Sequence, residues 1–74
     1  MKMAAYGGYR DTKQLKRTDF NILNMGEGRW IVTLCWDGLY QEWCDDADLI
    51  ERVNGYHATP ADLMKLYRLC KYGD

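Results

Sequence analysis

The alternation of apolar and polar residues is clearest between Trp30 and Cys44, where the sequence reads WIVTLCWDGLYQEWC. Asp37-Gly38 interrupts this alternation near its middle. An Asp-Gly pair between alternating apolar residues indicates a β-hairpin, because a type I′ turn needs positive φ at both central residues and these two residue types tolerate it. The stretch therefore predicts two antiparallel strands joined by a two-residue loop.

The length of that loop sets the register of the two strands. A two-residue loop places Trp36 opposite Leu39 and Val32 opposite Trp43. Side chains alternate between the two faces of a strand, so one face becomes the expected core: Trp30, Val32, Leu34, Trp36, Leu39 and Trp43. The other face is mixed and suits a solvated surface: Ile31, Thr33, Cys35, Tyr40, Glu42 and Cys44.

A further β-prone run, TDFNILNM at residues 18–25, precedes this hairpin and ends at the sequence Gly-Glu-Gly at residues 26–28. A short glycine-containing loop there closes a second hairpin and places Ile22 opposite Val32. The apolar residues of this run then join the same core face. Because the two registers agree, the sequence predicts a three-stranded antiparallel meander.

Two helices are expected after the third strand. The first covers residues 45–54, with Asp45 or Asp46 as its N-cap, a buried stripe of apolar residues, and Gly55 at C′. The second begins with Thr59 at N-cap, Pro60 at N1 and Asp62 at N3, close to a capping box. Its buried face is Leu63, Leu66, Tyr67 and Cys70, and Gly73 ends it.

The predicted fold class is therefore α+β, with the order β-β-β-α-α and both helices packed on the tryptophan-bearing face of the sheet. A chain of 74 residues forms one domain, which we place at residues 18–74. Residues 1–17 are expected to be a flexible N-terminal arm, with Tyr6, Tyr9 and Arg10 as its candidate contact residues.

The residue inventory argues against catalysis. The chain has no serine and one histidine, His57, which leaves only a Cys-His pairing as a source of a nucleophile. Its three cysteines, Cys35, Cys44 and Cys70, are an odd number, which does not fit a closed disulfide framework. Reduced thiols favour a cytoplasmic protein, and no apolar run reaches the roughly 18–20 residues of a membrane span.

A metal centre is also not expected. The three cysteines and His57 are ligand types that suit zinc, but they lack the short paired spacings that place two ligands together. The Gly-Glu-Gly sequence lacks the third glycine and the following helix of a dinucleotide fingerprint. We therefore expect no cofactor, no metal and no enzymatic activity.

Charge is distributed unevenly along the chain. Residues 1–18 carry a net charge of +4 and residues 19–62 a net charge of −7. The acidic residues concentrate where the third strand leads into the first helix, with tyrosines before and after them. This segment is the predicted partner-binding surface: Tyr40, Glu42, Asp45, Asp46, Asp48, Glu51 and Tyr56.

An acidic surface with tyrosines suits a basic groove on a protein or nucleoprotein complex. The expected function is a small protein that binds such a partner and inhibits or modulates it by occlusion. In size and lack of catalytic residues the chain is similar in type to accessory inhibitors of phages and mobile elements, the anti-CRISPR proteins among them. Homodimerisation through the edge of the first strand or the outer sheet face would enlarge its small core.

The alternative is a nucleic-acid-binding accessory or regulatory protein. Its basic N-terminal segment would contact phosphates, and its aromatic residues would stack on bases. The acidic middle of the chain argues against this alternative. A helix-turn-helix interpretation is also disfavoured, because the second helix begins Pro60-Ala61-Asp62 without base-reading or basic residues.

Overall fold

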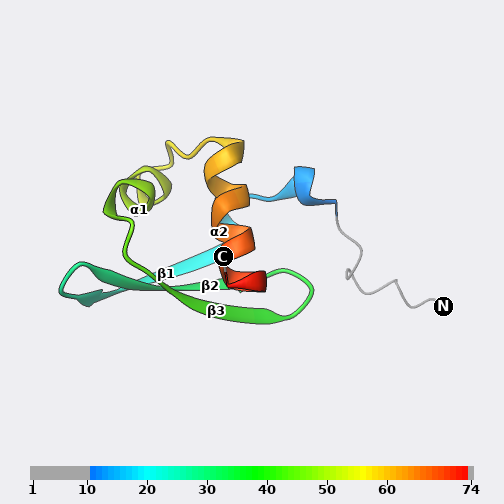
Figure 1. Cartoon of the computed structure of the whole chain (residues 1–74). Coiled ribbons are helices and arrows are strands. Elements are labelled where there is room, and N and C mark those ends of the chain that lie inside the picture. Colours follow the sequence, from blue (N-terminus) through cyan, green and yellow to red (C-terminus); the bar gives the residue numbers. More distant parts are fainter. Residues whose placement is uncertain (1–10, 74) are drawn as a thin grey trace.

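The computed structural model describes residues 11–73 and shows an α+β fold with a three-stranded antiparallel sheet followed by two helices (Figure 1). This confirms the predicted β-β-β-α-α order. The elements are the short 3-10 turns η2 (Thr12–Gln14) and η3 (Arg17–Asp19), the strands β1 (Phe20–Gly26), β2 (Arg29–Cys35) and β3 (Leu39–Cys44), and the helices α1 (Ala47–Asn54) and α2 (Pro60–Tyr72).

Both helices lie on the same side of the sheet (Figure 1), and the core fills the space between these two layers. Val32, Leu34 and Leu66 are fully buried there. The core residues come from the three strands, the two helices and the loop between β2 and β3: Phe20, Val32, Leu34, Trp36, Cys44, Leu49, Ile50, Val53, Leu66, Tyr67 and Cys70. Among residues 11–73, no helix is long and apolar enough to cross a membrane.

The β1–β2 hairpin has the predicted register, with Ile22 opposite Val32. At its tip Glu27 has a φ of 59° and Gly28 a φ of 72°, the positive pair that a type I′ turn requires. The pairing shifts by one residue between Asn24 and Gly26, so Gly26 belongs to the end of β1 rather than to the loop.

The predicted register of the β2–β3 hairpin is wrong by one residue. Cys35 lies opposite Leu39, and the loop contains three residues, Trp36–Gly38. Asp37 is not among the described non-glycine residues with positive φ, so the loop is not a type I′ turn. Instead Trp36 packs edge-on against Tyr67, with ring centroids 6.1 Å apart.

An ion pair also holds this loop toward α2. The Asp37 carboxylate accepts a hydrogen bond from Lys71 Nζ at 2.9 Å. Asp37, held by Lys71, lacks the positive φ that a two-residue type I′ loop needs, so the loop takes a third residue and the register shifts by one. The two faces of β3 are therefore exchanged relative to the prediction.

After this exchange Tyr40, Glu42 and Cys44 face the helices, whereas Leu39 and Trp43 lie on the opposite face of the sheet. Leu39 is 73% exposed and Trp43 is 45% exposed. Two of the six residues assigned to the core face by the sequence are thus on its outer side. Trp36 remains in the core, where it is buried.

The structure confirms the predicted N-terminal caps of both helices, but the end of α1 differs from the prediction. Asp46 is the N-cap of α1, and its Oδ1 accepts a hydrogen bond from the Leu49 amide at 3.2 Å. Gly55, however, has a right-handed φ of −85°, and Tyr56 takes the left-handed conformation with a φ of 61°. The His57 amide then bonds the Arg52 carbonyl at 2.8 Å, which turns the chain toward α2.

Arg17 fixes the segment before β1 against the end of α1. Its Nε and Nη1 donate to the carbonyls of Val53 and Phe20, both at 2.8 Å. Its Nη2 donates to Asn54 Oδ1 at 3.0 Å. Part of the segment assigned to an arm is therefore bonded to the domain, and the candidate arm contacts Tyr6, Tyr9 and Arg10 lie outside the described residues.

Candidate interaction surface

Three carboxylates at the start and along the exposed side of α1 form what we call the acidic surface: Asp45, Asp48 and Glu51. All three side chains are exposed, and none forms an ion pair within residues 11–73. Asp48 and Glu51 are three residues apart on α1 and so lie next to each other on the helix. Their charges therefore add on one side of the molecule.

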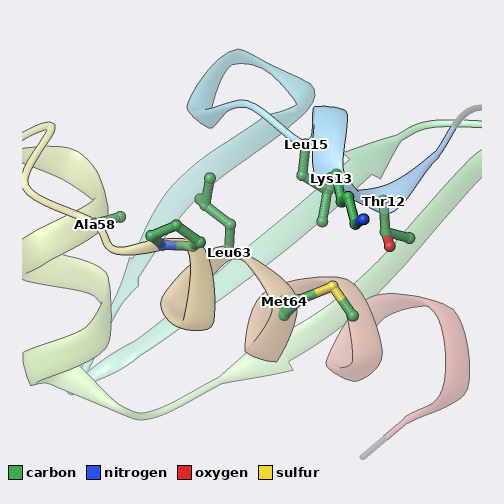
Figure 2. A pocket seen from close by; sticks show the side chains of 7 residues that line it. Thr12, Lys13, Leu15, Ala58, Leu63 and Met64 are labelled. Atoms are coloured by element: carbon green, nitrogen blue, oxygen red, sulfur yellow. The ribbon is translucent and has the colours of Figure 1, made fainter.

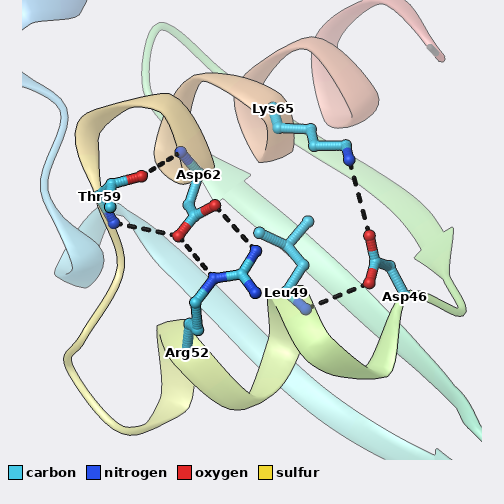
Figure 3. A network of polar contacts seen from close by, with 6 residues as sticks. All are labelled: Asp46, Leu49, Arg52, Thr59, Asp62 and Lys65. Atoms are coloured by element: carbon cyan, nitrogen blue, oxygen red, sulfur yellow. Dashed lines mark hydrogen bonds and ion pairs between the residues drawn. The ribbon is translucent and has the colours of Figure 1, made fainter.

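Asp46 lies between these residues in the sequence but has a structural role. One oxygen of its carboxylate caps α1, and the other lies 3.7 Å from Lys65 Nζ of α2 (Figure 3). The side chain is about half exposed. Much of its charge is thus committed to the helix end and to Lys65, and Asp46 contributes less to the acidic surface than its neighbours do.

Tyr40, which the sequence placed beside these carboxylates, lies toward the other end of β3. Four positions separate it from Cys44, or about 13 Å along a strand. Lys71 Nζ is 5.7 Å from the centre of its ring. A hydrogen bond to Asp37 and partial burial raise the pKa of the Tyr40 hydroxyl. Tyr40 therefore belongs to a cluster around Lys71 rather than to the acidic surface.

Glu42 differs from the three exposed carboxylates in burial, and Tyr56 lies at the far end of α1 from Asp45. Glu42 is half-buried on the helix face of β3. Tyr56 follows the C-terminal end of α1, where it is exposed and stacks near Arg17, whose guanidinium carbon lies 5.5 Å from the ring centre. The eight residues of α1 span about 12 Å, so Tyr56 and Asp45 lie at opposite ends of this helix.

The aromatic residue that does adjoin the acidic surface is Trp43. A hollow of about 140 Å³ brings Trp43 together with Asp45, Asp46 and Lys65. The guanidinium carbon of Arg29 lies 4.6 Å from the Trp43 ring centre. Sequence reasoning missed this residue because the two-residue loop assigned Trp43 to the core.

A larger groove of about 340 Å³ lies on another part of the molecule, between η2 and the start of α2 (Figure 2). Figure 2 shows Lys13 and Leu15 on one side of it and Leu63 and Met64 on the other. Its full lining is Thr12, Lys13, Leu15, Ala58, Pro60, Leu63 and Met64. The groove is mainly apolar, with the amine of Lys13 as its one charged group.

The two buried thiols, Cys44 and Cys70, are not activated nucleophiles. Burial raises the pKa of Cys44, and it raises that of Cys70 to about 11. The Cys70 thiol donates a hydrogen bond to the Val32 carbonyl at 3.5 Å. Cys35 lies on the opposite face of the sheet, and His57 is exposed in the loop after α1. Within residues 11–73, no group of three or more histidine, cysteine, aspartate or glutamate side chains is placed to hold a metal ion.

Comparison with known proteins gives no relative: no protein-family model matches the chain, and no curated protein or solved structure matches it significantly. The functional interpretation therefore depends on the charges, exposure and packing described above.

Proposed function

We propose that the protein is a non-enzymatic binding protein that places the acidic surface of α1 against a basic groove of a macromolecular partner and blocks it. The observation that carries this proposal is the exposure of Asp45, Asp48 and Glu51 without ion pairs among the described residues. Exposed carboxylates that form no ion pair among the described residues are available to a basic partner, and they also accelerate its encounter with the protein.

Trp43 supports this proposal as a contact anchor. Tryptophan is enriched among the residues that contribute most to protein–protein binding, because its large ring buries much apolar area with few rotatable bonds. Trp43 is 45% exposed and lines the same hollow as Asp45. The combination of an apolar anchor and adjacent carboxylates suits a partner that presents both basic and apolar side chains.

Blocking, rather than catalysis, is the mode of action that we propose. A protein of this size can cover a groove that normally holds another ligand, such as a nucleic acid, by presenting carboxylates in place of phosphates. Accessory inhibitors of phages and mobile elements, including anti-CRISPR proteins, are the type of protein to which we assign it, with a cytoplasmic site of action. The partner would be a protein or nucleoprotein complex.

Direct nucleic-acid binding is the competing function, and one observation weakens it. Arg17 is bonded to Val53, Phe20 and Asn54, which leaves Lys13 and Lys16 as the exposed cations of the described N-terminal segment. Two lysines supply few of the phosphate contacts that such binding needs, and the other cations of the basic segment, Lys2 and Arg10, lie outside the described residues.

Affinity capture from lysate of the host cell distinguishes the two functions. The bound material is recovered with and without nuclease, then identified by mass spectrometry and nucleic-acid staining. We expect a stoichiometric protein complex that survives nuclease. Recovery that disappears after nuclease would instead favour direct nucleic-acid binding.

A pair of matched variants then tests the acidic surface with the captured partner. The double variant Asp48→Asn/Glu51→Gln removes two of its charges, and the control Asp11→Asn/Glu27→Gln removes two exposed carboxylates elsewhere. We expect the first to weaken binding about tenfold or more at low salt and the control to bind like the wild type. Equal binding by both variants would exclude the acidic surface as the site.

A further inference from the structure

We propose that a second copy of this chain packs against the face of the sheet that the helices leave uncovered, forming a two-fold symmetric dimer. Figure 1 shows α1 and α2 together on one side of the sheet and no described element on the other. This inference rests on the sheet and not on the acidic surface, but it shares Trp43 with the proposed function, so a second copy and the partner would compete for that side chain.

The uncovered face, which we call the open face, consists of three rows of paired side chains. One row contains Leu23, Ile31 and Trp43, and another contains Cys35 and Leu39. The row between them contains Asn21, Thr33 and Gln41. Leu23, Leu39 and Trp43 are 57%, 73% and 45% exposed, so the apolar residues of two rows are open to solvent.

Two of the three residues of the polar row, Thr33 and Gln41, are bonded to each other, and the third, Asn21, lies on the edge strand β1. Gln41 Nε2 donates a hydrogen bond to Thr33 Oγ1 at 3.0 Å across the two strands. Covering a polar group is costly when it loses its hydrogen-bond partner, and this pair already holds its partner within the sheet. The centre of the open face can therefore be covered by an apolar surface.

Charge identifies a second copy as the occupant. None of the eight residues that form these three rows is an acidic or basic residue. Arg29, two residues before Ile31 on β2, lies on the same side of the sheet, and its guanidinium carbon is 4.6 Å from the centre of the Trp43 ring, so it is a charged side chain at this face. At the adjoining hairpin, Arg29 and Glu27 supply one charge of each sign, which two copies can exchange across a two-fold axis.

The area of the open face sets the strength of the association. Three strands of six or seven residues give a footprint of roughly 14 by 23 Å, at strand spacings of about 4.8 Å and a rise of about 3.3 Å per residue. Sheets pack face to face at about 10 Å. An interface of this size is at the small end of specific interfaces, below about 1,200 Å² in total, so we expect a reversible dimer.

Sedimentation velocity measures this association directly. We expect the wild-type full chain to shift from monomer to dimer between about 1 and 500 μM, the range expected for a small interface. Leu39→Lys and Leu23→Lys each place a charge on the open face and should remain monomeric throughout. Tyr72→Lys, at an exposed position at the end of α2 whose ring touches Tyr67 edge-on, adds the same charge elsewhere and should dimerise like the wild type.

Cys35 provides a second measurement that needs no variant. It is the exposed cysteine, whereas Cys44 and Cys70 are buried. With iodoacetamide in excess, alkylation of Cys35 should slow several-fold as the wild-type concentration rises through the sedimentation transition. The Leu39→Lys variant should show no such protection, and far-ultraviolet circular dichroism establishes that it is folded.

Three outcomes would overturn the proposal. A wild-type chain that stays monomeric up to 500 μM would exclude the dimer. Dimerisation that Tyr72→Lys abolishes, while Leu39→Lys and Leu23→Lys preserve it, would assign association to another surface. Alkylation of Cys35 that is independent of concentration, in a sample that sedimentation shows to be dimeric, would likewise exclude the open face as the interface.

Discussion

Arg52 and Asp62 join the two helices through a bidentate ion pair, with Arg52 Nε 2.9 Å from Asp62 Oδ2 and Nη2 3.0 Å from Oδ1 (Figure 3). The same carboxylate accepts the Thr59 amide at 3.1 Å, and the Thr59 hydroxyl accepts the Asp62 amide at 3.1 Å. One side chain thus completes the capping box of α2 and ties this helix to α1. Its contacts lower the pKa of Asp62 to about 2, with the hydrogen bond from Arg52 as the largest cause.

This pKa predicts acid sensitivity in a defined range. The folded-state pKa of Asp62 lies below the ordinary value of about 3.9, so its stabilisation is fully present above about pH 4 and is lost as the pH falls toward 2. We expect the free energy of unfolding to fall across this range in the wild type. In the Asp62→Asn variant, the free energy of unfolding should be lower at pH 7 than in the wild type, and it should fall less steeply between pH 4 and 2.

Urea denaturation at a series of pH values, followed by circular dichroism, measures this effect. Asp45→Asn removes an exposed carboxylate that forms no ion pair in the described chain, and it serves as the matched control. If Asp62→Asn retained the pH dependence of the wild type, the acid sensitivity would have to come from other carboxylates.

The register of β3 predicts very different roles for two tryptophans. Trp36 is buried and packs against Tyr67, so Trp36→Ala should cost about 3–5 kcal/mol. Trp43 lies on the open face, where its contact with Arg29 is worth about 0.5–1 kcal/mol, so Trp43→Ala should cost about 1 kcal/mol. Urea unfolding of the two variants, at protein concentrations below those at which the dimer forms, compares the two losses of stability.

A loss of 3–5 kcal/mol is a large part of the stability of a small domain, about 5–15 kcal/mol. Trp36→Phe and Trp43→Phe therefore provide a milder pair, for which the same order is expected. A two-residue loop would place both tryptophans in the core. Equal losses of stability, or a larger loss for the Trp43 variant, would therefore contradict the observed register.

We expect replacement of Arg17 by lysine to reduce the stability of the fold. Its planar guanidinium reaches the carbonyls of Val53 and Phe20 and the amide oxygen of Asn54 at the same time, and a lysine amine cannot reproduce that fork. Arg17→Lys leaves carbonyls without a donor and should reduce the free energy of unfolding by about 1–3 kcal/mol. Lys16→Gln, at the exposed neighbouring position, should change it by less than about 0.5 kcal/mol.

Urea unfolding of both variants gives these values, and native-state hydrogen exchange at the Phe20 and Asn54 amides locates the change. Wild-type stability in Arg17→Lys would show that the three hydrogen bonds contribute little to holding the segment before β1.

Two substitutions at Asp46 distinguish what its helix cap contributes to the free energy of unfolding from what its charge contributes. Asparagine is as good an N-cap as aspartate, whereas alanine is not. Asp46→Asn should therefore keep the free energy of unfolding within about 0.5 kcal/mol, because the partly exposed pair with Lys65 at 3.7 Å is worth little. Asp46→Ala should lose about 1 kcal/mol. Thermal unfolding at pH 7 compares the two, and an equal loss in both would assign the effect to the pair with Lys65.

Signals confined to a few neighbouring residues predicted most of this fold. The capping box at Thr59 and Asp62 acts within one turn of a helix, and the structure shows it as expected. The β1–β2 register follows from a short loop whose residues can adopt positive φ. Such features need no knowledge of distant packing, so the order of the strands and helices was readable from the chain.

The β3 register was not readable because distant residues decide it. Lys71 is 34 positions from its partner Asp37, and Tyr67 packs on Trp36 from the same helix. The ion pair with Lys71 holds Asp37 without the positive φ of a two-residue turn, so the loop includes a third residue that the local Asp-Gly signal does not predict. The error also moved the candidate site, since it hid Trp43 and placed Tyr40 beside carboxylates that lie at the other end of its strand.

The three-residue loop at Trp36–Gly38 also has a consequence for the evolution of this chain. Deleting one residue there would exchange the faces of β3, bringing Trp43 under the helices and turning Glu42 outward. A change in length at this position would therefore alter the surface more than most changes of residue type in the strand itself. In a divergent relative, the number of residues in this loop would indicate which side chains of the third strand are available to other molecules.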